Sequence, residues 1–353
     1  MTLKTLEQVP AAVQVAPADH SRLPVLDGWR GISILSVLAC HLLPIGPKWM
    51  QLNAAAGLFG MSLFFTLSGF LITAPLYRSP QVVPFLIRRF CRILPLAFLY
   101  IVVAMVILAK GPAFYASHFL FLINYQHQYI TELTGHFWSL CVEIQFYVGV
   151  GILVLLAGRR GLLLLPILCV VVTLLRVWTG THYSIVTHLR IDEILSGATL
   201  TLIMCGALPH FIRGALGRVP WFVWLAGLLV SCHELGGPAN YLRPYLAAGL
   251  VGSTIWRRTM INPWLETRQL KYIAETSYAL YVIHPLAHWG WLGTGGSIMK
   301  YAMKRPITFA LTFAAAHLST FLYERRWIEL GKKWAKHAAS RTLPDRQGAS
   351  RQN

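Results

Sequence analysis

Long runs of apolar residues recur along the whole chain, and two of the clearest are Leu162 to Leu175 and Ile101 to Ala109. A helix needs about 20 predominantly apolar residues to cross the hydrocarbon core of a bilayer. The chain is 56% hydrophobic and only 12% charged over 353 residues, which is typical of a polytopic membrane protein and not of a soluble enzyme. We therefore expect an all-α, polytopic transmembrane helix bundle.

Ten segments are apolar enough to be expected as membrane spans. They lie at about 27–45, 57–77, 92–110, 136–157, 161–178, 190–207, 219–234, 240–256, 272–292 and 305–323. Most of the 31 lysines and arginines then fall on one side, which the positive-inside rule assigns to the cytoplasm together with both termini. Membrane topology thus explains the net charge of +18, and we expect no nucleic-acid partner.

The domain organisation predicted from this pattern is simple. We expect a loose cytoplasmic tail at 1–24, a transmembrane domain at 25–325 and a basic cytoplasmic tail at 326–353. The first tail lacks the regions of a signal peptide, so no cleavable signal is expected. The stretch ERRWIELGKKWAKH at 324–337 is typical of an amphipathic helix on anionic lipid. Six cysteines without a CxxC pair predict neither a disulfide framework nor a zinc site.

The first expected span, WRGISILSVLACHLL, carries Arg30 and His41. Ionisable groups inside a span cost at least ~2.5 kcal/mol each on insertion scales, so they indicate function. Eleven residues place the two side chains about 20° apart around a helix and about 16 Å apart along it, so both should face one cleft. Asp27, one turn earlier, could hold the guanidinium. The alternative is a snorkelling arginine and a hydrogen-bonded core histidine.

A second polar group lies in HFWSLCVEIQFY at 136–147. Ser139, Glu143 and Tyr147 follow one another at intervals of four and form one stripe on an otherwise apolar helix. A lone glutamate in a span needs a partner, and His41 or Arg30 would supply one. A structural ion pair between two helices is the alternative to a catalytic pair.

The segment FLIRRFCRILP at 85–95 places Arg88, Arg89 and Arg92 on about one helix turn. Arg88 and Arg92 should share a face, and the nearby helix N-terminus adds partial positive charge. Ordinary anchoring at the cytoplasmic surface would explain this cluster. The sharper interpretation is a clamp for the phosphates of a cytosolic cofactor.

Two further motifs carry polar side chains in apolar surroundings. In ETSYALYVIHPLAHW, Ser277, Tyr281 and His284 share one face, which we expect to line a cleft through hydrogen bonds. His284 and His288 make a poor metal pair, because Pro285 separates them and no carboxylate ligand is near in sequence. No metal is therefore expected.

In HLRIDEILSG, Asp192 and Glu193 could bind a polar acceptor or pair with Arg190. A solvated helix end is the alternative, and the sequence leaves it open.

Together these blocks resemble the acyltransferase-3 family of bacterial integral-membrane O-acyltransferases. The similarity runs from LDGWRG at 26–31 to ERRW at 324–327. Six blocks occur in the expected order, and they are LDGWRGISILSVLACH, LFFTLSGFLIT at 63–73, FLIRRFCRILPL at 85–96, HFWSLCVEIQFY, LRIDEILSGATL and TSYALYVIHP. The resemblance implies transfer of an acyl group, usually acetyl, from cytosolic acyl-CoA to a hydroxyl of a sugar or another extracytoplasmic or lipid-linked acceptor. It also implies the bacterial cytoplasmic (inner) membrane as location.

The resemblance assigns roles position by position. His41 matches the catalytic histidine and Arg30 its paired arginine, while the three arginines of the cluster match the motif for the CoA phosphates. Residues that match the central polar helix or are expected to bind substrate or line the cleft are Trp138, Ser139, Glu143, Tyr147, Ser68, Asp192, Tyr281 and His284. Ile144 departs from the family, because a second acidic residue is common there. No secreted hydrolase-like domain follows the bundle, so a second transfer step on this chain is not expected.

These assignments predict a mechanism. His41, oriented by Glu143, would act as general base on the acceptor hydroxyl or as a transient acyl carrier, with Arg30, Ser139 or Tyr147 stabilising the oxyanion. The main alternative is a proton-coupled transporter or flippase that uses Arg30, His41 and Glu143 as a relay, although no internal repeat supports it. A structural subunit of a polysaccharide assembly complex is a weaker alternative. The acceptor, the acyl group and the oligomeric state remain open.

Overall fold

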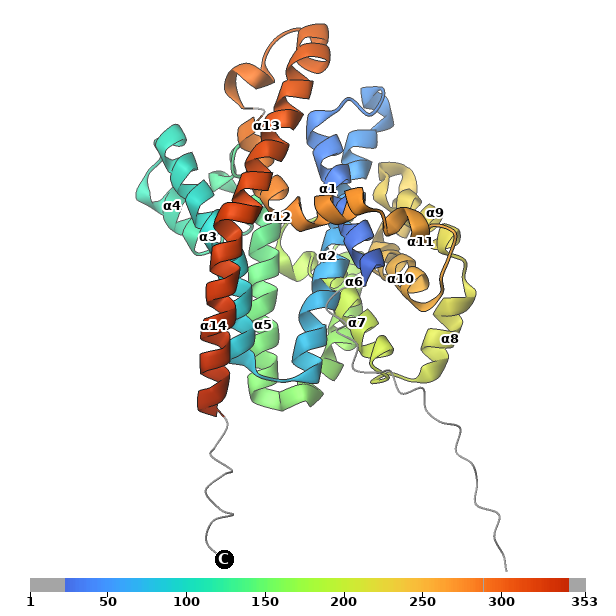
Figure 1. Cartoon of the computed structure of the whole chain (residues 1–353). Coiled ribbons are helices and arrows are strands. Elements are labelled where there is room, and N and C mark those ends of the chain that lie inside the picture. Colours follow the sequence, from blue (N-terminus) through green and yellow to red (C-terminus); the bar gives the residue numbers. More distant parts are fainter. Residues whose placement is uncertain (1–22, 288, 343–353) are drawn as a thin grey trace, which may run out of the picture.

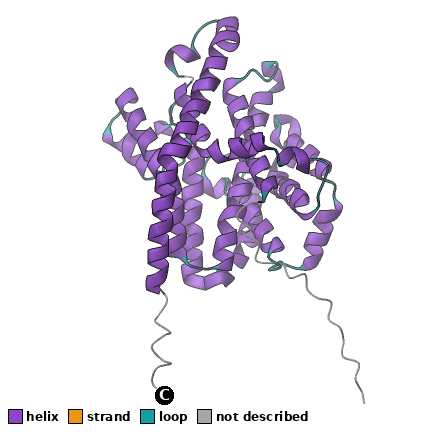
Figure 2. Ribbon diagram, in the orientation of Figure 1, coloured by secondary structure: helices purple, strands orange, loops and turns teal. Residues whose placement is uncertain are grey.

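The structure is a computed structural model that describes residues 23–287 and 289–342, and every element in these ranges is helical (Figure 2). The all-α prediction is therefore confirmed. The α-helices up to the middle of the chain are α1 (Pro24–Leu42), α2 (Leu52–Arg78), α3 (Val82–Leu108), α4 (Pro112–Phe119), α5 (Phe137–Gly161), α6 (Leu165–Trp178) and α7 (Asp192–Met204). Those that follow are α8 (His210–Arg218), α9 (Trp221–Cys232), α10 (Arg243–Trp256), α11 (Asn262–Leu265), α12 (Arg268–Ala287), α13 (Arg305–Leu318) and α14 (Arg325–Thr342). Most of the expected N-terminal tail, His288 and residues after 342 lie outside the described ranges.

Within the described residues, five helical stretches are long and apolar enough to cross a membrane, or six if the bent pair α8–α9 counts as one span. The expected number of ten is not confirmed. One reason is that the stretch Phe137–Trp178 counts once although it has 42 residues, about 63 Å of helix against a hydrocarbon core of about 30 Å. Gly158 interrupts it with φ 57° and ψ −153°, and α5 and α6 run in different directions from that end (Figure 1). These two helices correspond to two of the expected spans.

The other reason is that some expected spans are short helices buried inside the bundle. α7 has 13 residues and α10 has 14, which is about 20 Å of helix each. Most of their side chains are buried, including those of Leu200 and Leu250. An apolar segment of 10 to 14 residues is more typical of a core helix than of a span. Composition alone does not separate the two cases.

The centre of the bundle is α2, which packs most extensively against α7 and α1. Glycines allow the backbones of α2 and α7 to touch. A Cβ atom on Gly69 would lie 1.8 Å from the carbonyl oxygen of Ile194, and one on Gly197 would lie 1.8 Å from that of Thr66. Small residues at a membrane helix crossing permit this close approach. The crossing fixes α7, whose first turn carries Asp192 and Glu193.

We expect Gly197→Ala to destabilise the protein by about 1–3 kcal/mol, because the added methyl group has no space unless the two helices separate. The measurement is the melting temperature of the purified protein in detergent. Gly149→Ala is the matched control, since nothing lies within 4 Å of its Cβ position in α5. An unchanged melting temperature for Gly197→Ala would contradict the close crossing.

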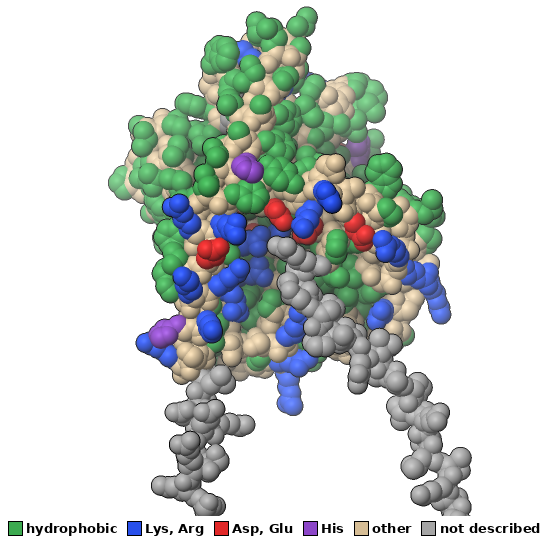
Figure 3. Space-filling view, viewed as in Figure 1, with side chains coloured by type: hydrophobic (Ala, Val, Ile, Leu, Met, Phe, Trp, Pro, Cys, Tyr) green, Lys and Arg blue, Asp and Glu red, His purple; other side chains and the backbone are tan. Residues whose placement is uncertain are grey.

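The basic segment near the C-terminus forms α14, which packs along α3, and its contact with lipid stays a prediction. Its buried face includes Gly331 and Ala335, and a Cβ on Gly331 would lie 2.6 Å from the Cβ of Cys91. Lys332, Lys333 and other cations stay exposed. In the face shown in Figure 3, lysines and arginines gather over the lower half, whereas the upper half is largely hydrophobic. The cytoplasmic orientation of this end stays a prediction.

Candidate active site

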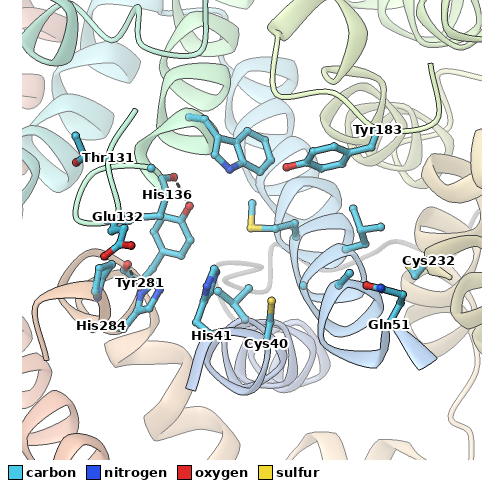
Figure 4. Close-up of a pocket in the computed structure, with 18 of the residues that line it drawn as sticks. Cys40, His41, Gln51, Thr131, Glu132, His136, Tyr183, Cys232, Tyr281 and His284 are labelled. Atoms are coloured by element: carbon cyan, nitrogen blue, oxygen red, sulfur yellow. Dashed lines mark hydrogen bonds between the residues drawn. The ribbon is translucent and has the colours of Figure 1, made fainter. Parts of the chain in front are cut away.

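The molecule contains a large cavity of about 1150 Å³. Its wall is built by the end of α1, the beginning of α2, the turn before α5, the loop between α6 and α7, the segment between α9 and α10, the end of α12, and the segment from Trp289 to Arg305. Four residues singled out in the sequence line it, and these are His41, Trp138, Tyr281 and His284 (Figure 4). The fold therefore brings parts of three separate sequence motifs to one cavity.

His41 lies in the last turn of α1 and its side chain is exposed. Its ring centroid is 5.2 Å from that of His284, which comes from α12 and is only 1% exposed. The Nδ1 atom of His284 lies 2.8 Å from the carbonyl oxygen of Tyr281. Because hydrogen bonding to its own helix fixes His284, it offers a rigid surface beside the accessible ring of His41. That arrangement suits a histidine that exchanges protons with a ligand.

The hydroxyl of Tyr281 is held from two directions. It donates to the carbonyl oxygen of His136 over 2.5 Å and shares a hydrogen bond with Ser139. The ring of His136 lies 5.5 Å from that of His284, so it belongs to the same aromatic cluster (Figure 4). Ser139 does not line the cavity and acts instead by holding Tyr281.

Glu143 lies outside the lining of this cavity. Its carboxylate accepts hydrogen bonds from Ser68 and Tyr147, and Glu143 is only 6% exposed. α5 begins at the cavity and leads away from it, so Glu143 is about 7.5 Å further along the helix than Trp138. Of the two partners expected for Glu143, His41 or Arg30, the structure places Arg30 close enough to interact with its charge, while Ser68 and Tyr147 donate hydrogen bonds to its carboxylate.

Arg30 also lies outside the cavity lining, on the part of α1 that precedes His41. It is close enough to Arg92, Arg89, Asp27 and Glu143 to interact electrostatically with each of them. The structure thus separates the expected site into two levels along α1. One is the cavity with His41, and the other is a cluster of three arginines around Glu143.

The three arginines of α3 do not act alike. Arg88 is exposed, whereas Arg89 and Arg92 are half-buried beside Arg30. Arg89 donates to the carbonyl oxygen of Leu71 over 2.7 Å and lies over the ring of Phe85. Of the clamp expected from Arg88, Arg89 and Arg92, only Arg89 and Arg92 lie beside Arg30, whereas Arg88 is exposed. Three cations at one place are the donor set that phosphate groups require.

Asp192 and Glu193 are fully buried, so the solvated helix end is excluded. Asp192 pairs with Arg176 over 2.6 Å and does not line the cavity, which corrects its assignment as a cleft residue. Glu193 lies 3.1 Å from Arg190 and 3.8 Å from Arg243 and accepts from Ser62. Arg190 and Arg243 do line the cavity.

Several lining residues were not singled out in the sequence as site residues. They include His136, Arg243, Lys300 and Arg305. His136 is the first residue of the motif HFWSLCVEIQFY, so its place beside Trp138 could have indicated it. Lys300 and Arg305 lie in or next to a segment expected on the extracytoplasmic side, where the positive-inside rule disfavours cations, and this unusual placement could have indicated them. Among the described residues, no group of three or more His, Cys, Asp or Glu is arranged to hold a metal ion.

Comparison with known proteins adds a family match. The sequence model of an acyltransferase domain family (Acyl_transf_3) matches residues 23–324. The chain is 31% identical to "Peptidoglycan O-acetyltransferase OatA" of Listeria monocytogenes serovar 1/2a over 314 residues, which cover 74% of this chain and 49% of that protein. It is 26% identical to "Putative peptidoglycan O-acetyltransferase YrhL" of Bacillus subtilis over 321 residues, which cover 75% and 48%. The chain thus spans about half the length of these relatives, and no solved structure matches it significantly.

Proposed function

The chain belongs to the acyltransferase-3 family, whose match covers residues 23–324, and on that basis we propose that it is a membrane O-acetyltransferase. It moves an acetyl group from cytosolic acetyl-CoA to a sugar hydroxyl of a surface polysaccharide or glycolipid. The names of its relatives favour peptidoglycan or a comparable cell-wall glycan as the acceptor. We place it in the bacterial cytoplasmic membrane with both termini in the cytoplasm, as the distribution of lysines and arginines favours.

The observation that carries this proposal is the cavity that contains His41. An exposed histidine next to the fixed ring of His284 is available to a ligand of considerable size, because the cavity volume is about 1150 Å³. Pockets for small molecules usually have about 300–1,000 Å³. The cavity therefore has room for a saccharide and not only for an acetyl group.

The chemistry assigned to the cavity is a single acyl transfer. His41 takes the proton of the acceptor hydroxyl while the hydroxyl oxygen forms a bond to the thioester carbonyl carbon. The carbon–sulfur bond then breaks, and the proton on His41 goes to the leaving thiolate. A route through an acetylated His41 uses the same groups in two steps. Acetylated protein recovered after mixing with labelled acetyl-CoA alone would support the two-step route.

The arginine cluster supports a site for the donor at the second level. Arg30 comes from α1 and Arg89 and Arg92 come from α3, so cations from two helices meet beside Glu143. In this proposal they bind the CoA phosphates, and Arg30 lies about 16 Å from His41 along α1. A donor with an extended arm would bridge that distance.

We expect Arg92→Gln and Arg89→Gln each to raise the KM for acetyl-CoA about tenfold, because each removes one charge-assisted hydrogen bond to phosphate. The measurement is the rate of acetyl transfer at varied acetyl-CoA concentration. Arg88→Gln is the matched control on the same helix turn, and its KM should stay within about twofold because Arg88 is exposed. Equal effects of all three substitutions would contradict the inward cluster.

The proposal as a whole is tested by acetyl-CoA itself. Purified protein in lipid nanodiscs should bind acetyl-CoA and consume it when an acceptor glycan is present. Protein that neither binds nor consumes acetyl-CoA, while His41→Ala alters movement of a solute across vesicles, would replace the enzyme with the transporter.

A further inference from the structure

We propose that the cavity recognises an acceptor that carries an oxyanion, a carboxylate or a phosphate, and that Arg190 is the residue that binds it. This inference rests on the proposed function and names the class of acceptor. Arg190 lies two residues before α7 and lines the cavity. Its neighbour Tyr183 lies across the cavity from His41 (Figure 4).

Arg190 is buried but its hydrogen bonds are not completed by the protein. It is 1% exposed, and none of its three guanidinium nitrogens has a hydrogen-bond partner among the residues that the structure describes. The guanidinium lies between the rings of Phe65, Trp138 and Tyr183, at 5.5–5.8 Å. Its contact with Glu193 at 3.1 Å is an ion contact without hydrogen-bond geometry. A buried cation with open donors is costly unless a ligand supplies acceptors.

Arg176 shows what a purely structural arginine looks like in the same network. Its Nη1 donates to Asp192 over 2.6 Å, its Nη2 to the carbonyl oxygens of His182 and Asn240, and its Nε to that of Thr181. Arg176 is as buried as Arg190 but does not line the cavity. The protein therefore supplies hydrogen-bond acceptors to Arg176, which lies away from the cavity, and leaves the donors of Arg190 at the cavity wall without acceptors.

The charges at this wall do not balance. Glu193 lies 3.1 Å from Arg190 and 3.8 Å from Arg243, and Asp192 pairs with Arg176. Asp192 is also close enough to Arg190 to interact with its charge, so two carboxylates face three guanidinium groups. One positive charge is therefore in excess, and an anionic ligand would compensate it.

Two further cations line the cavity, Lys300 in the segment before α13 and Arg305 at the first residue of α13. Arg305 is 4% exposed, and its Nε and Nη1 have no hydrogen-bond partner. The acidic residues of the lining, Glu132 and Glu234, are both exposed to solvent, whereas the guanidinium groups are buried.

The size and the surface of the cavity favour the acceptor, not the acyl group, as the carrier of the oxyanion. A volume of about 1150 Å³ exceeds what a short acyl chain needs. Trp138, Tyr183 and Trp289 present aromatic rings in the lining, and aromatic walls with a few fixed polar groups are typical of sites for organic ligands. The site is therefore built for a ring-bearing molecule with one negative group.

The test is a binding experiment with full-length protein in nanodiscs and three probes of matched size. The probes are methyl glucoside, methyl glucuronide and methyl glucoside 6-phosphate, and the readout is the dissociation constant from quenching of tryptophan fluorescence. We expect at least one anionic probe to bind about tenfold or more tightly than the neutral probe, since a charged hydrogen bond is worth that much. The stronger of the two anionic probes identifies carboxylate or phosphate. Equal or undetectable binding of all three overturns the inference.

Variants localise the effect. Arg190→Gln should reduce the ratio of anionic to neutral affinity to about one, and Arg305→Gln should lower it without touching the Glu193 contacts. Arg258→Gln is the control, because Arg258 is exposed and does not line the cavity, so this variant should keep the ratio. A preserved ratio in Arg190→Gln contradicts the assignment, whatever Arg305→Gln does.

Binding of free succinate shows whether the anion site recognises the acceptor or a dicarboxylic acyl group of the donor. If succinate binds as tightly as the anionic glycosides and depends on Arg190, the site belongs to a dicarboxylic acyl group and the assignment to the acceptor fails. Binding does not require turnover, so a failed anion preference beside intact acetyl-CoA consumption rejects this inference alone. A protein that selects anionic glycosides but never consumes acetyl-CoA rejects the proposed function instead.

Discussion

His41→Ala is expected to lower kcat for acetyl transfer by about 10²–10⁴-fold, the range that a positioned general base contributes. The protein should stay folded, because the ring of His41 is exposed at the end of α1 and fills no core space. The measurement is labelled acetyl transfer from acetyl-CoA to a glycan acceptor by protein in nanodiscs, with kcat and KM determined separately. If His41 is the base, kcat should fall while KM for acetyl-CoA changes little, since the donor cations lie at another level of the bundle.

The control for His41 is another histidine outside the cavity. His210 is exposed in α8 and does not line the cavity, so His210→Ala should retain the wild-type rate. Melting temperatures of both variants establish that each is folded. A His41→Ala protein with at least half of the wild-type kcat would remove His41 from the reaction.

Asp192→Ala is expected to destabilise the protein by about 3–5 kcal/mol, because it leaves Arg176 as a buried charge without its carboxylate. Asp192 is 0% and Arg176 is 1% exposed, and their atoms lie 2.6 Å apart, so water cannot replace the lost partner. The measurement is the melting temperature of the purified protein and its amount in the membrane. Activity per folded molecule should change far less, since Asp192 does not line the cavity.

The chain contains a matched surface pair for comparison. Arg325 and Glu329 lie 3.3 Å apart on α14, with side chains 69% and 57% exposed. Glu329→Ala should leave the melting temperature unchanged, because exposed ion pairs are screened by water and salt. Similar losses for Asp192→Ala and Glu329→Ala would show that the buried network does not hold the bundle together.

The sequence predicted well which motifs lie close together. It predicted less well how far along its helix each side chain lies relative to the side chains of neighbouring helices. His41, Trp138, Tyr281 and His284 were expected to face clefts, and all four line one cavity. Helical spacing gives the face of a side chain, but the relative height of two helices depends on their packing. This is why the sequence left His41 and Arg30 as alternative partners of Glu143, whereas the structure places its carboxylate near Arg30, with hydrogen bonds from Ser68 and Tyr147.

The partners of the buried charged residues and the number of membrane spans could not be predicted from local sequence either. The pairing of Glu193 with Arg190 was one of the options visible in the sequence, and the structure contains it. The further partners Arg176 and Arg243 come from α6 and α10, so the burial of Asp192 and Glu193 follows only from the three-dimensional arrangement. The short helices α7 and α10 have the composition of spans but the burial of core helices. The open donors of Arg190 and Arg305 became visible only with all neighbours in place.

Mass spectrometry of surface glycans is the most direct test that the protein O-acetylates a glycan and uses His41 to do so. Three strains are compared: one produces the wild-type protein, one produces none, and one produces His41→Ala at the wild-type membrane level. We expect base-labile O-acetyl groups on glycans from wild-type cells and their loss in both other strains. Glycans with the same O-acetyl content in all three strains, or in the wild-type and His41→Ala strains alone, would contradict it.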